Sequence, residues 1–268
     1  MSHVAELPEA VSSAPQVARK HAGALDLRSV SKTYQVDGQP LQVLQNISLV
    51  VEPGEFVTLV GSSGCGKSTI LRLIVGLDTD YNGDILLDGA PITGPGLERS
   101  IVFQEHRLLP WLTVEQNIAL GLESSRVLLA ERQRTVREHI DLVGLTGFEK
   151  AYPRQLSGGM AQRAAIARSL VTRPEILLLD EPLAALDSLT RSYLQQELLR
   201  IWSQEKVTMV MVTHDVEEAV FLSDKVVILA PRPGRIHKVI PIDLPHPRNR
   251  VDSEFGAYRQ AVIGELTH

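Results

Sequence analysis

The stretch that decides the fold is Gly61-Ser62-Ser63-Gly64-Cys65-Gly66-Lys67-Ser68. An apolar run typical of a strand, Phe56 to Val60, precedes it, and apolar residues recur at helical spacing over residues 68–77. A glycine-rich loop that joins a strand to a helix and ends in Lys-Ser has the spacing of a phosphate-binding loop. Its backbone N–H groups converge on phosphate oxygens at the start of the helix. A chance glycine turn is the alternative, and the flanking strand and helix argue against it.

Two side chains of this loop carry specific chemistry. Lys67 is expected to reach the β- and γ-phosphates, and the Ser68 hydroxyl is expected to be a ligand of Mg²⁺. The complementary acid follows the apolar run Ile176 to Leu179, where Asp180 is predicted to hold the Mg²⁺ shell. Glu181, directly after it, is the candidate for orienting or deprotonating the attacking water. The alternative for Glu181 is an acid that stabilises the start of a helix.

The remaining pattern predicts an α/β fold with a helical insert. Alternating apolar segments with tight turns indicate β structure over residues 25–60, and residues 114–170 are mainly helical. In the insert we expect Leu129, Val136, Ile140 and Val143 to share one buried face. From Glu175 onward apolar runs alternate with helices, which is typical of a parallel sheet.

Composition excludes several classes of protein. The chain has 268 residues and a formal net charge of −5, so we expect no nucleic-acid partner. One cysteine, Cys65, excludes an intrachain disulfide. No apolar run is long enough to span a bilayer, and residues 1–24 do not have the pattern of a secretory signal. The guanine-reading sequence Asn-Lys-x-Asp of a GTPase is absent.

A second anion site is predicted at Ser157-Gly158-Gly159, which opens a helix. We expect it to face the ATP that is held by a second copy of the chain, because it cannot reach the phosphate bound by Lys67 without distorting the chain. With this motif the chain, from about Leu25 to about Arg250, resembles the ATP-binding subunits of ABC transporters. The resemblance implies a P-loop NTPase core of ABC type, with an N-terminal antiparallel β subdomain and an inserted α-helical subdomain.

The resemblance also implies roles for isolated residues. Tyr34 would stack on the adenine, Gln104 would reach Mg²⁺ and the water, and His214 would contact the γ-phosphate. Asp187, in Ala185-Leu186-Asp187, would lie against the partner subunit. Taken alone, Tyr34 is more typical of packing at a sheet edge, and His214 of a helix cap or a surface position.

The predicted site has three groups of residues. The catalytic group is Glu181, His214 and Gln104. The metal ligands are Ser68, Gln104 and Asp180. The nucleotide-binding group is Tyr34, Gly61, Ser62, Ser63, Gly64, Cys65, Gly66, Lys67, Ser68, Thr69, Ser157, Gly158, Gly159 and Asp187.

The predicted organisation has three parts. Residues 1–24 are a mobile tail, residues 25–245 are the ATP-binding domain with its insert at about 104–170, and residues 246–268 are a C-terminal tail. The expected place of the protein is the cytoplasmic face of the plasma membrane, as a peripheral subunit.

Two positions leave alternatives open. Met160 stands where the common family form has Gln, and its side chain has no amide to donate a hydrogen bond. Cys65, beside a helix N-terminus, is either a thiol of lowered pKa that a maleimide would modify or a small loop residue.

A transport role requires separate membrane subunits, since the chain has no membrane span of its own. The segment His106 to Leu112, which includes Trp111, is the expected docking groove for a short helix of the permease; packing under the insert is its alternative. Leu109-Pro110-Trp111 and Arg232 to Ile236 resemble the ATPases of nitrate, aliphatic sulfonate and taurine importers, which also use a solute-binding protein. We favour aliphatic sulfonates over nitrate, taurine or another small solute. A soluble ABC ATPase outside transport is the alternative from another class.

Overall fold

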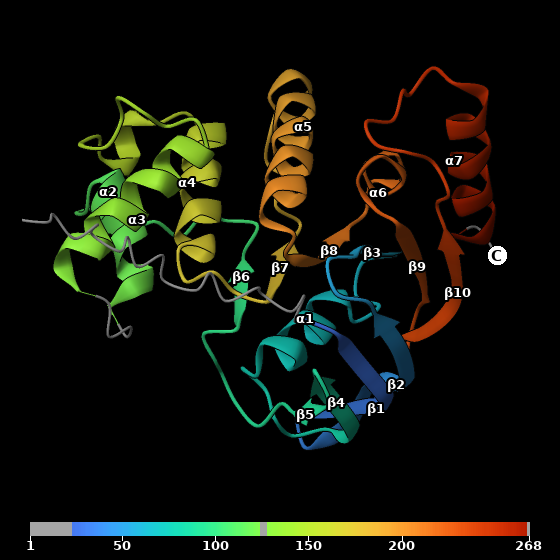
Figure 1. Cartoon of the computed structure of the whole chain (residues 1–268). Helices are drawn as coiled ribbons and strands as arrows, with labels where there is room; N and C mark the ends of the chain where they lie inside the picture. The colour runs from blue at the N-terminus through green and yellow to red at the C-terminus, as the bar shows by residue number, and fades with distance from the viewer. Residues whose placement is uncertain (1–22, 124–127, 267–268) are drawn as a thin grey trace, which may run out of the picture.

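A six-stranded sheet in the order β10-β9-β3-β8-β7-β6 forms the centre of the computed structural model, which describes residues 23–123 and 128–266 (Figure 1). Its strands are β3 (Phe56–Gly61), β6 (Arg99–Val102), β7 (Ile176–Asp180), β8 (Thr208–Thr213), β9 (Lys225–Ala230) and β10 (Arg235–Pro241). Strands β9, β3, β8, β7 and β6 are mutually parallel, and β10 is antiparallel to β9. The carboxyl ends of the five parallel strands therefore share one edge.

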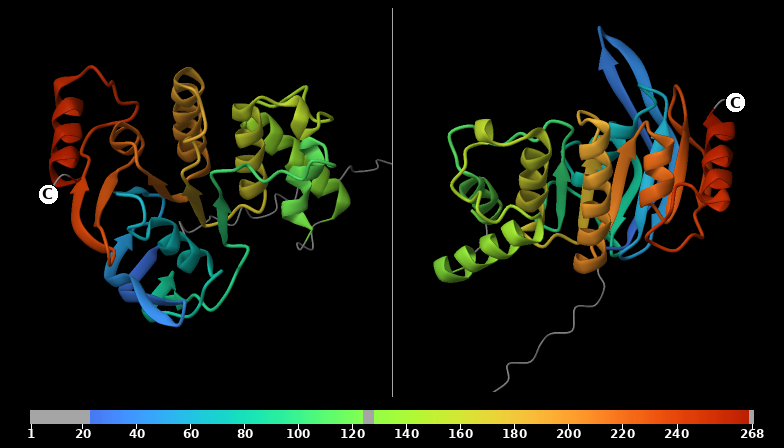
Figure 2. Two further views of the ribbon diagram at one scale, coloured as in Figure 1. Left: turned by 180° about the vertical axis from the view of Figure 1, so that it is seen from behind. Right: turned by 90° about the horizontal axis from the view of Figure 1, so that it is seen from above.

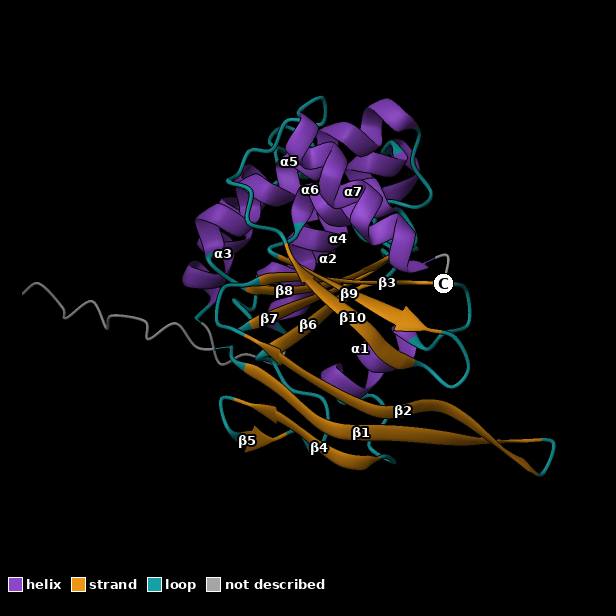
Figure 3. Ribbon diagram, turned by 90° about the vertical axis from the view of Figure 1, so that its right-hand side faces the viewer, coloured by secondary structure: helices purple, strands orange, loops and turns teal. Residues whose placement is uncertain are grey.

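The central sheet is covered on both faces, as the uninterrupted apolar strands require. On one face lies helix α1 (Lys67–Val75), between this sheet and an antiparallel sheet (Figure 3). The antiparallel sheet has the order β2-β1-β4-β5. Its strands are β1 (Leu25–Val36), β2 (Gln39–Val51), β4 (Asn82–Leu87) and β5 (Ala90–Pro91). On the other face lie α5 (Ser188–Glu205), α6 (Val216–Leu222) and α7 (Ser253–Leu266).

Side-chain alternation along the strands divides the interior into two apolar cores. Leu177 and Leu179 of β7 pack with the helices, whereas Leu178 of the same strand packs with α1 and the antiparallel sheet. Successive residues of a strand point to opposite faces, so each strand serves both cores.

The helical insert leaves the sheet after β6 and returns before β7. It consists of α2 (Val114–Ala119), the 3₁₀ turn η1 (Leu120–Leu122), α3 (Leu129–Leu142), the 3₁₀ turn η2 (Pro153–Gln155) and α4 (Gly158–Leu170). Three of the four predicted face residues are buried, but Leu129 is 71% exposed, so its assignment was wrong. Leu129 is the first residue of α3, where the helix has not yet reached the core. Figure 2 shows the insert and α7 at opposite ends of the molecule.

The two predicted tails differ in what the structure describes. Residues 1–22 lie outside the described residues. Within 246–268, residues 253–266 form α7, and Phe255 and Val262 of this helix are buried in the core beside α6. This part of the chain is therefore a packed element and not a loose extension. Among the helices in 23–123 and 128–266, none combines the length and the apolar character that crossing a membrane requires.

Candidate nucleotide site

The phosphate loop follows the carboxyl end of β3 and opens α1. Gly64 and Gly66 have φ of 77° and 97°, a left-handed conformation that glycine adopts without strain. A Cβ on Gly61 would lie 2.8 Å from Sγ of Cys65 and from the carbonyl oxygen of Leu229, so this position has no room for a side chain. The loop therefore requires glycine for two reasons. Gly64 and Gly66 allow the backbone to bend, and Gly61 allows β9 to approach closely.

Lys67 is held inside the loop that it terminates. Its side chain is buried, and Nζ donates to the carbonyl oxygens of Gly61 (2.8 Å) and Ser62 (3.2 Å). Ser62, Ser63 and Gly64 are exposed, as is Ser68. The Lys67 ammonium group thus lies beneath the exposed backbone of residues 62–64. A loop of this kind is typical of an anion-binding site.

Cys65 resolves one alternative from the sequence. The side chain is 1% exposed, and burial raises the pKa of its thiol, an effect that outweighs the nearby charge of Lys67. These observations favour the small loop residue over the reactive thiolate, because the Cys65 side chain packs in the apolar core beneath the loop. Cys65 is a small buried residue that supports the loop.

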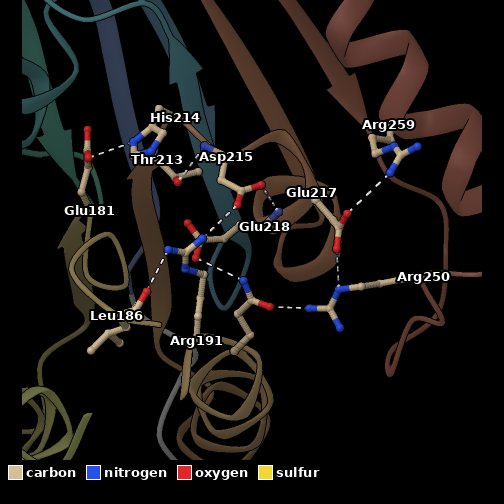
Figure 4. A network of polar contacts seen from close by, with 11 residues as sticks. Glu181, Leu186, Arg191, Thr213, His214, Asp215, Glu217, Glu218, Arg250 and Arg259 are labelled. Atoms are coloured by element: carbon tan, nitrogen blue, oxygen red, sulfur yellow. Dashed lines mark hydrogen bonds and ion pairs between the residues drawn. The ribbon is translucent and has the colours of Figure 1, made fainter. Parts of the chain in front are cut away.

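The two acidic residues at the carboxyl end of β7, Asp180 and Glu181, each meet a predicted partner. Ser68 Oγ donates to Asp180 Oδ1 at 2.9 Å, which joins the start of α1 to the end of β7. Glu181 Oε2 lies 3.0 Å from His214 Nδ1, at the end of β8 (Figure 4). Glu181 does not start a helix, since the next helix, α5, begins at Ser188. His214 is exposed, and Asp215, not His214, caps α6.

Gln104 and the Ser-Gly-Gly motif border one hollow. Gln104 follows the carboxyl end of β6 and is exposed. A hollow of about 740 Å³ is lined by Gln104, Asp180 and Gly158, among others. Ser157 is the N-cap of α4, and its Oγ accepts a hydrogen bond from the Met160 backbone N–H at 3.3 Å. The motif thus presents a helix N-terminus to this open space.

The Met160 side chain is not among the residues that line the hollow. Its side chain packs against the main apolar core. Gln162 is buried and reaches the Phe103 carbonyl oxygen at 3.4 Å, so it does not replace the missing amide. The N-terminus of α4 also fits tightly on α5, where a Cβ on Gly159 would lie 2.6 Å from Thr190 Cγ2.

Tyr34 lies beside α1 and is held by a hydrogen bond. Its hydroxyl donates to Asp78 Oδ2 at 2.9 Å, and Thr69, near the start of α1, lies close enough to act on its pKa. Burial, followed by the contacts with Asp78, raises the pKa of this phenol. Sequence reasoning missed Asp78, because its connection to Tyr34 spans 44 residues and no local pattern marks it.

Asp187 lies at the start of α5, as an exposed N-cap. Its Oδ1 accepts hydrogen bonds from the backbone N–H groups of Leu189 (3.1 Å) and Thr190 (3.0 Å). Hydrogen bonds from Thr190 hold the pKa of its carboxyl below the usual value. The capping role was not predicted, although Asp before a helix is a standard signal for it.

Arg232 is a further neighbour of the phosphate loop that sequence reasoning used only as part of a signature. It follows the carboxyl end of β9, and a Cβ on Gly64 would lie 3.5 Å from its Nη2. The five parallel strands thus deliver to one edge the phosphate loop, Gln104, Asp180 with Glu181, His214 and Arg232. In parallel sheets this carboxyl edge is where ligands bind.

The segment His106 to Leu112 is divided between the two alternatives. Leu108 is buried in the insert, as the packing alternative expects. Trp111 is 68% exposed, as the docking alternative expects. Leu108 thus anchors the segment to the insert, and Trp111 exposes its indole to solvent.

Comparison with known proteins agrees with this site. A family model described as ABC transporter matches residues 44–184. The aliphatic sulfonates import ATP-binding protein SsuB of Bacillus subtilis is 51% identical over 245 residues, which are 91% of this chain and 94% of that protein. An uncharacterized ABC transporter ATP-binding protein of Methanocaldococcus jannaschii is 50% identical over 90% of this chain and 91% of its own length.

Solved structures show the same fold. An ATP-binding cassette determined as a dimer bound to ADP and Pi matches with a TM-score of 0.71 at 31% identity, over 82% of this chain and all of that one. The cbiO1 subunit of a Clostridium perfringens ABC transporter matches with a TM-score of 0.74 at 26% identity, over 82% and 89% of the two chains. The chain belongs to the ABC transporter family and is an ATP-binding, ATP-hydrolysing member of it. The alternative of a soluble ATPase outside transport finds no support among these relatives.

Proposed function

We propose that this chain is the ATPase subunit of an importer of aliphatic sulfonates. The observation that carries the ATPase half is the meeting of Ser68 with Asp180 and of Glu181 with His214 at one sheet edge. The sulfonate half is supported by the names of relatives that are 48 to 51% identical over about nine-tenths of the chain. The fold is shared by ABC ATPases of many solutes, so the substrate rests on these names.

In this proposal the loop residues 61–69 bind the phosphates of ATP, with Lys67 as the cation. Tyr34 packs on the adenine, since it lies next to Thr69 at the start of α1. Glu181 polarises the attacking water, and His214, which contacts Glu181, orients that carboxylate toward the γ-phosphate. Gln104 adds a polar contact from the end of β6.

The residues present fit Mg²⁺. Ser68 and Asp180 place a hydroxyl and a carboxylate oxygen 2.9 Å apart, and oxygen ligands are those that Mg²⁺ prefers. Within residues 23–123 and 128–266 no cluster of three His, Cys, Asp or Glu forms a metal site, which suits an ion that shares its ligands with phosphates. When bound, Mg²⁺ would neutralise charge on the phosphates.

The proposed assembly contains two copies of this chain. Ser157, Gly158 and Gly159 of one copy cover the ATP of the other, and Asp187 lies at the contact between them. Membrane permease subunits dock at the segment 106–112 through exposed Trp111, and a solute-binding protein delivers the substrate. The complex lies on the cytoplasmic face of the plasma membrane.

Growth on defined sulfur sources tests the substrate and the catalytic role together. A strain that lacks this gene is complemented with the wild type or with Glu181→Gln and grown on ethanesulfonate, taurine or sulfate, and separately on nitrate as the nitrogen source. We expect loss of growth on ethanesulfonate alone, restored by the wild type and not by Glu181→Gln. A defect confined to taurine or nitrate would reassign the solute. Rescue by Glu181→Gln would refute the role of Glu181.

A further inference from the structure

Arg191, in the first turn of α5, joins two loops of the nucleotide site. Its Nη2 donates to the carbonyl oxygen of Leu186 at 2.9 Å, and its Nη1 lies 3.7 Å from Asp215 Oδ2 (Figure 4). About a third of the side chain is exposed. Neither the sequence patterns nor the proposed catalytic roles use this residue.

The first loop that Arg191 contacts is the one proposed to face the second copy. Leu186 lies between Glu181 and the N-cap Asp187, within Ala185-Leu186-Asp187. Its neighbours Ala185 and Asp187 are exposed. The guanidinium of Arg191 therefore holds a backbone carbonyl in the middle of this exposed segment.

The second loop is the one that carries His214. Asp215 follows His214 directly, and its Oδ1 accepts a hydrogen bond from the Glu218 backbone N–H at 3.1 Å as the N-cap of α6. The Asp215 backbone N–H also donates to Thr213 Oγ1 at 3.1 Å. Asp215 thus connects His214 to the start of α6, and Arg191 forms an ion pair with Asp215.

A second contact between the same two helices supports the first. Gln195, one turn further along α5, donates through Nε2 to Glu218 Oε1 at 3.3 Å. Glu218 is buried. Arg191 contacts the N-cap of α6, and Gln195 contacts Glu218 in its first turn. Two successive turns of α5 therefore contact the start of α6, at Asp215 and at Glu218.

We propose that Arg191 is a positioning residue that couples the segment 185–187 to His214, so that docking of the second copy sets the contact between His214 and Glu181. This inference rests on the proposed function, since it uses the second copy and the roles of the two catalytic residues. Arginine suits the task because its planar guanidinium presents separate N–H groups to Leu186 and Asp215 in a fixed geometry, whereas the lysine ammonium is a compact point charge without that geometry.

The test uses the complex that copurifies with a tagged copy of the full chain. Arg191→Gln is expected to lower kcat about tenfold and to change the KM for ATP by less than about twofold, because nucleotide contacts remain. Arg191→Lys should recover part of the loss. Arg134→Gln, an exposed change of equal charge on α3, is the control and should behave as the wild type.

A second variant isolates the pair. Asp215→Asn keeps the N-cap, since Asn caps helices as well as Asp does, but it removes the charge that faces Arg191. We expect it to lower kcat as Arg191→Gln does, and the double variant to be no slower than the slower single variant. If Arg191→Gln fails to fold, the kcat of Asp215→Asn alone tests whether the pair couples the two loops.

Failures of the two proposals are distinguishable. Glu181→Gln that hydrolyses ATP as the wild type does would overturn the proposed function. With Glu181→Gln inactive, a wild-type kcat in Arg191→Gln or Asp215→Asn would overturn the coupling role. A raised KM with unchanged kcat would also overturn it, because Arg191 would then act on nucleotide binding.

Discussion

Lys32 is a charged residue with 3% of its side chain exposed, and its position explains how Tyr34 is held. Its Nζ donates to Asp78 Oδ1 at 2.8 Å and contacts the Asp80 carbonyl oxygen. The ammonium also lies 4.7 Å from the centre of the Tyr34 ring. A buried charge without partners is costly, so this cluster ties β1 to the loop after α1.

Asp78→Asn tests this cluster through its pH dependence. Burial alone would raise the pKa of the Asp78 carboxyl, but hydrogen bonds from Lys32 and Tyr34 outweigh it and hold the pKa below 3.8. The stability that the carboxylate contributes is therefore present above pH 3.8 and is lost as the pH falls through the lowered pKa. At neutral pH we expect Asp78→Asn to reduce the free energy of unfolding by about 1.5 to 3 kcal/mol.

Urea unfolding of both proteins between pH 7 and pH 3 is the measurement. The difference between wild type and Asp78→Asn should shrink toward the acid end. Asp80→Asn is the matched control, because Asp80 is 98% exposed although it also faces Lys32. A difference independent of pH would show that the charge of Asp78 is not what stabilises the cluster.

At the scale of elements, the loop between β9 and β10 packs directly against the phosphate loop at Gly234 and Cys65. The Gly234 backbone N–H donates to the Val43 carbonyl oxygen at 2.8 Å, and its carbonyl oxygen accepts from the Gln45 N–H at 2.9 Å. A Cβ at Gly234 would lie 2.1 Å from the carbonyl oxygen of Cys65. The two hydrogen bonds to β2 hold Gly234 in this position, so the β9–β10 loop cannot move away from Cys65 without breaking them.

Gly234→Ala is therefore expected to displace the phosphate loop. Overpacking at this contact should cost about 1 to 3 kcal/mol of stability and lower the affinity for ATP several-fold. Thermal unfolding and equilibrium binding of ATP are the measurements. Gly256→Ala in α7 is the control, since a Cβ there meets no heavy atom within 4 Å. Unchanged ATP binding in Gly234→Ala would show that the phosphate loop tolerates the shift.

Sequence predicted the elements that carry a local signal. The phosphate loop, Asp180 with Glu181, and His214 each follow an apolar strand, and parallel strands bring such exits to one edge. Other features depend on partners distant in sequence. The contact of Arg191 with Asp215 and that of Tyr34 with Asp78 join separate elements, so spacing within either element cannot reveal them.

Helix boundaries and weak helices were also beyond local patterns. Helical spacing placed Leu129 with Val136, but it does not say where a helix first meets the core. Helix α7 was missed because Gly256 and Gly264 lower its helix propensity. Its burial at Phe255 and Val262 comes from packing beside α6, which only the assembled fold provides.

At the scale of the whole molecule, the charged edge of the central sheet is open. The phosphate loop is exposed at Ser62, Ser63 and Gly64, and the N-terminus of α4 presents Gly158 to a hollow beside Asp180. A similar cassette is a dimer bound to ADP and Pi. A second copy that covers this edge would exclude water from the phosphates, which strengthens every charge interaction there.

Slowing hydrolysis should therefore trap the pair of chains. We expect Glu181→Gln with ATP and Mg²⁺ to elute as a dimer of twice the mass of the nucleotide-free chain, measured by size-exclusion chromatography with light scattering. ATP stabilises the contact only while it is intact, so the wild type should return to monomer as ATP is consumed. In the Glu181→Gln background, Gly158→Glu should abolish the dimer but keep ATP binding, because its carboxylate would face the partner's phosphates.

The same charge placed elsewhere separates this effect from a general one. Gly256→Glu in α7, where a Cβ meets open space, should leave the dimer intact. A dimer that persists with Gly158→Glu would mean that the N-terminus of α4 does not lie on the partner's nucleotide. A Glu181→Gln chain that stays monomeric with ATP would mean that the permease, and not the nucleotide, holds the two copies together.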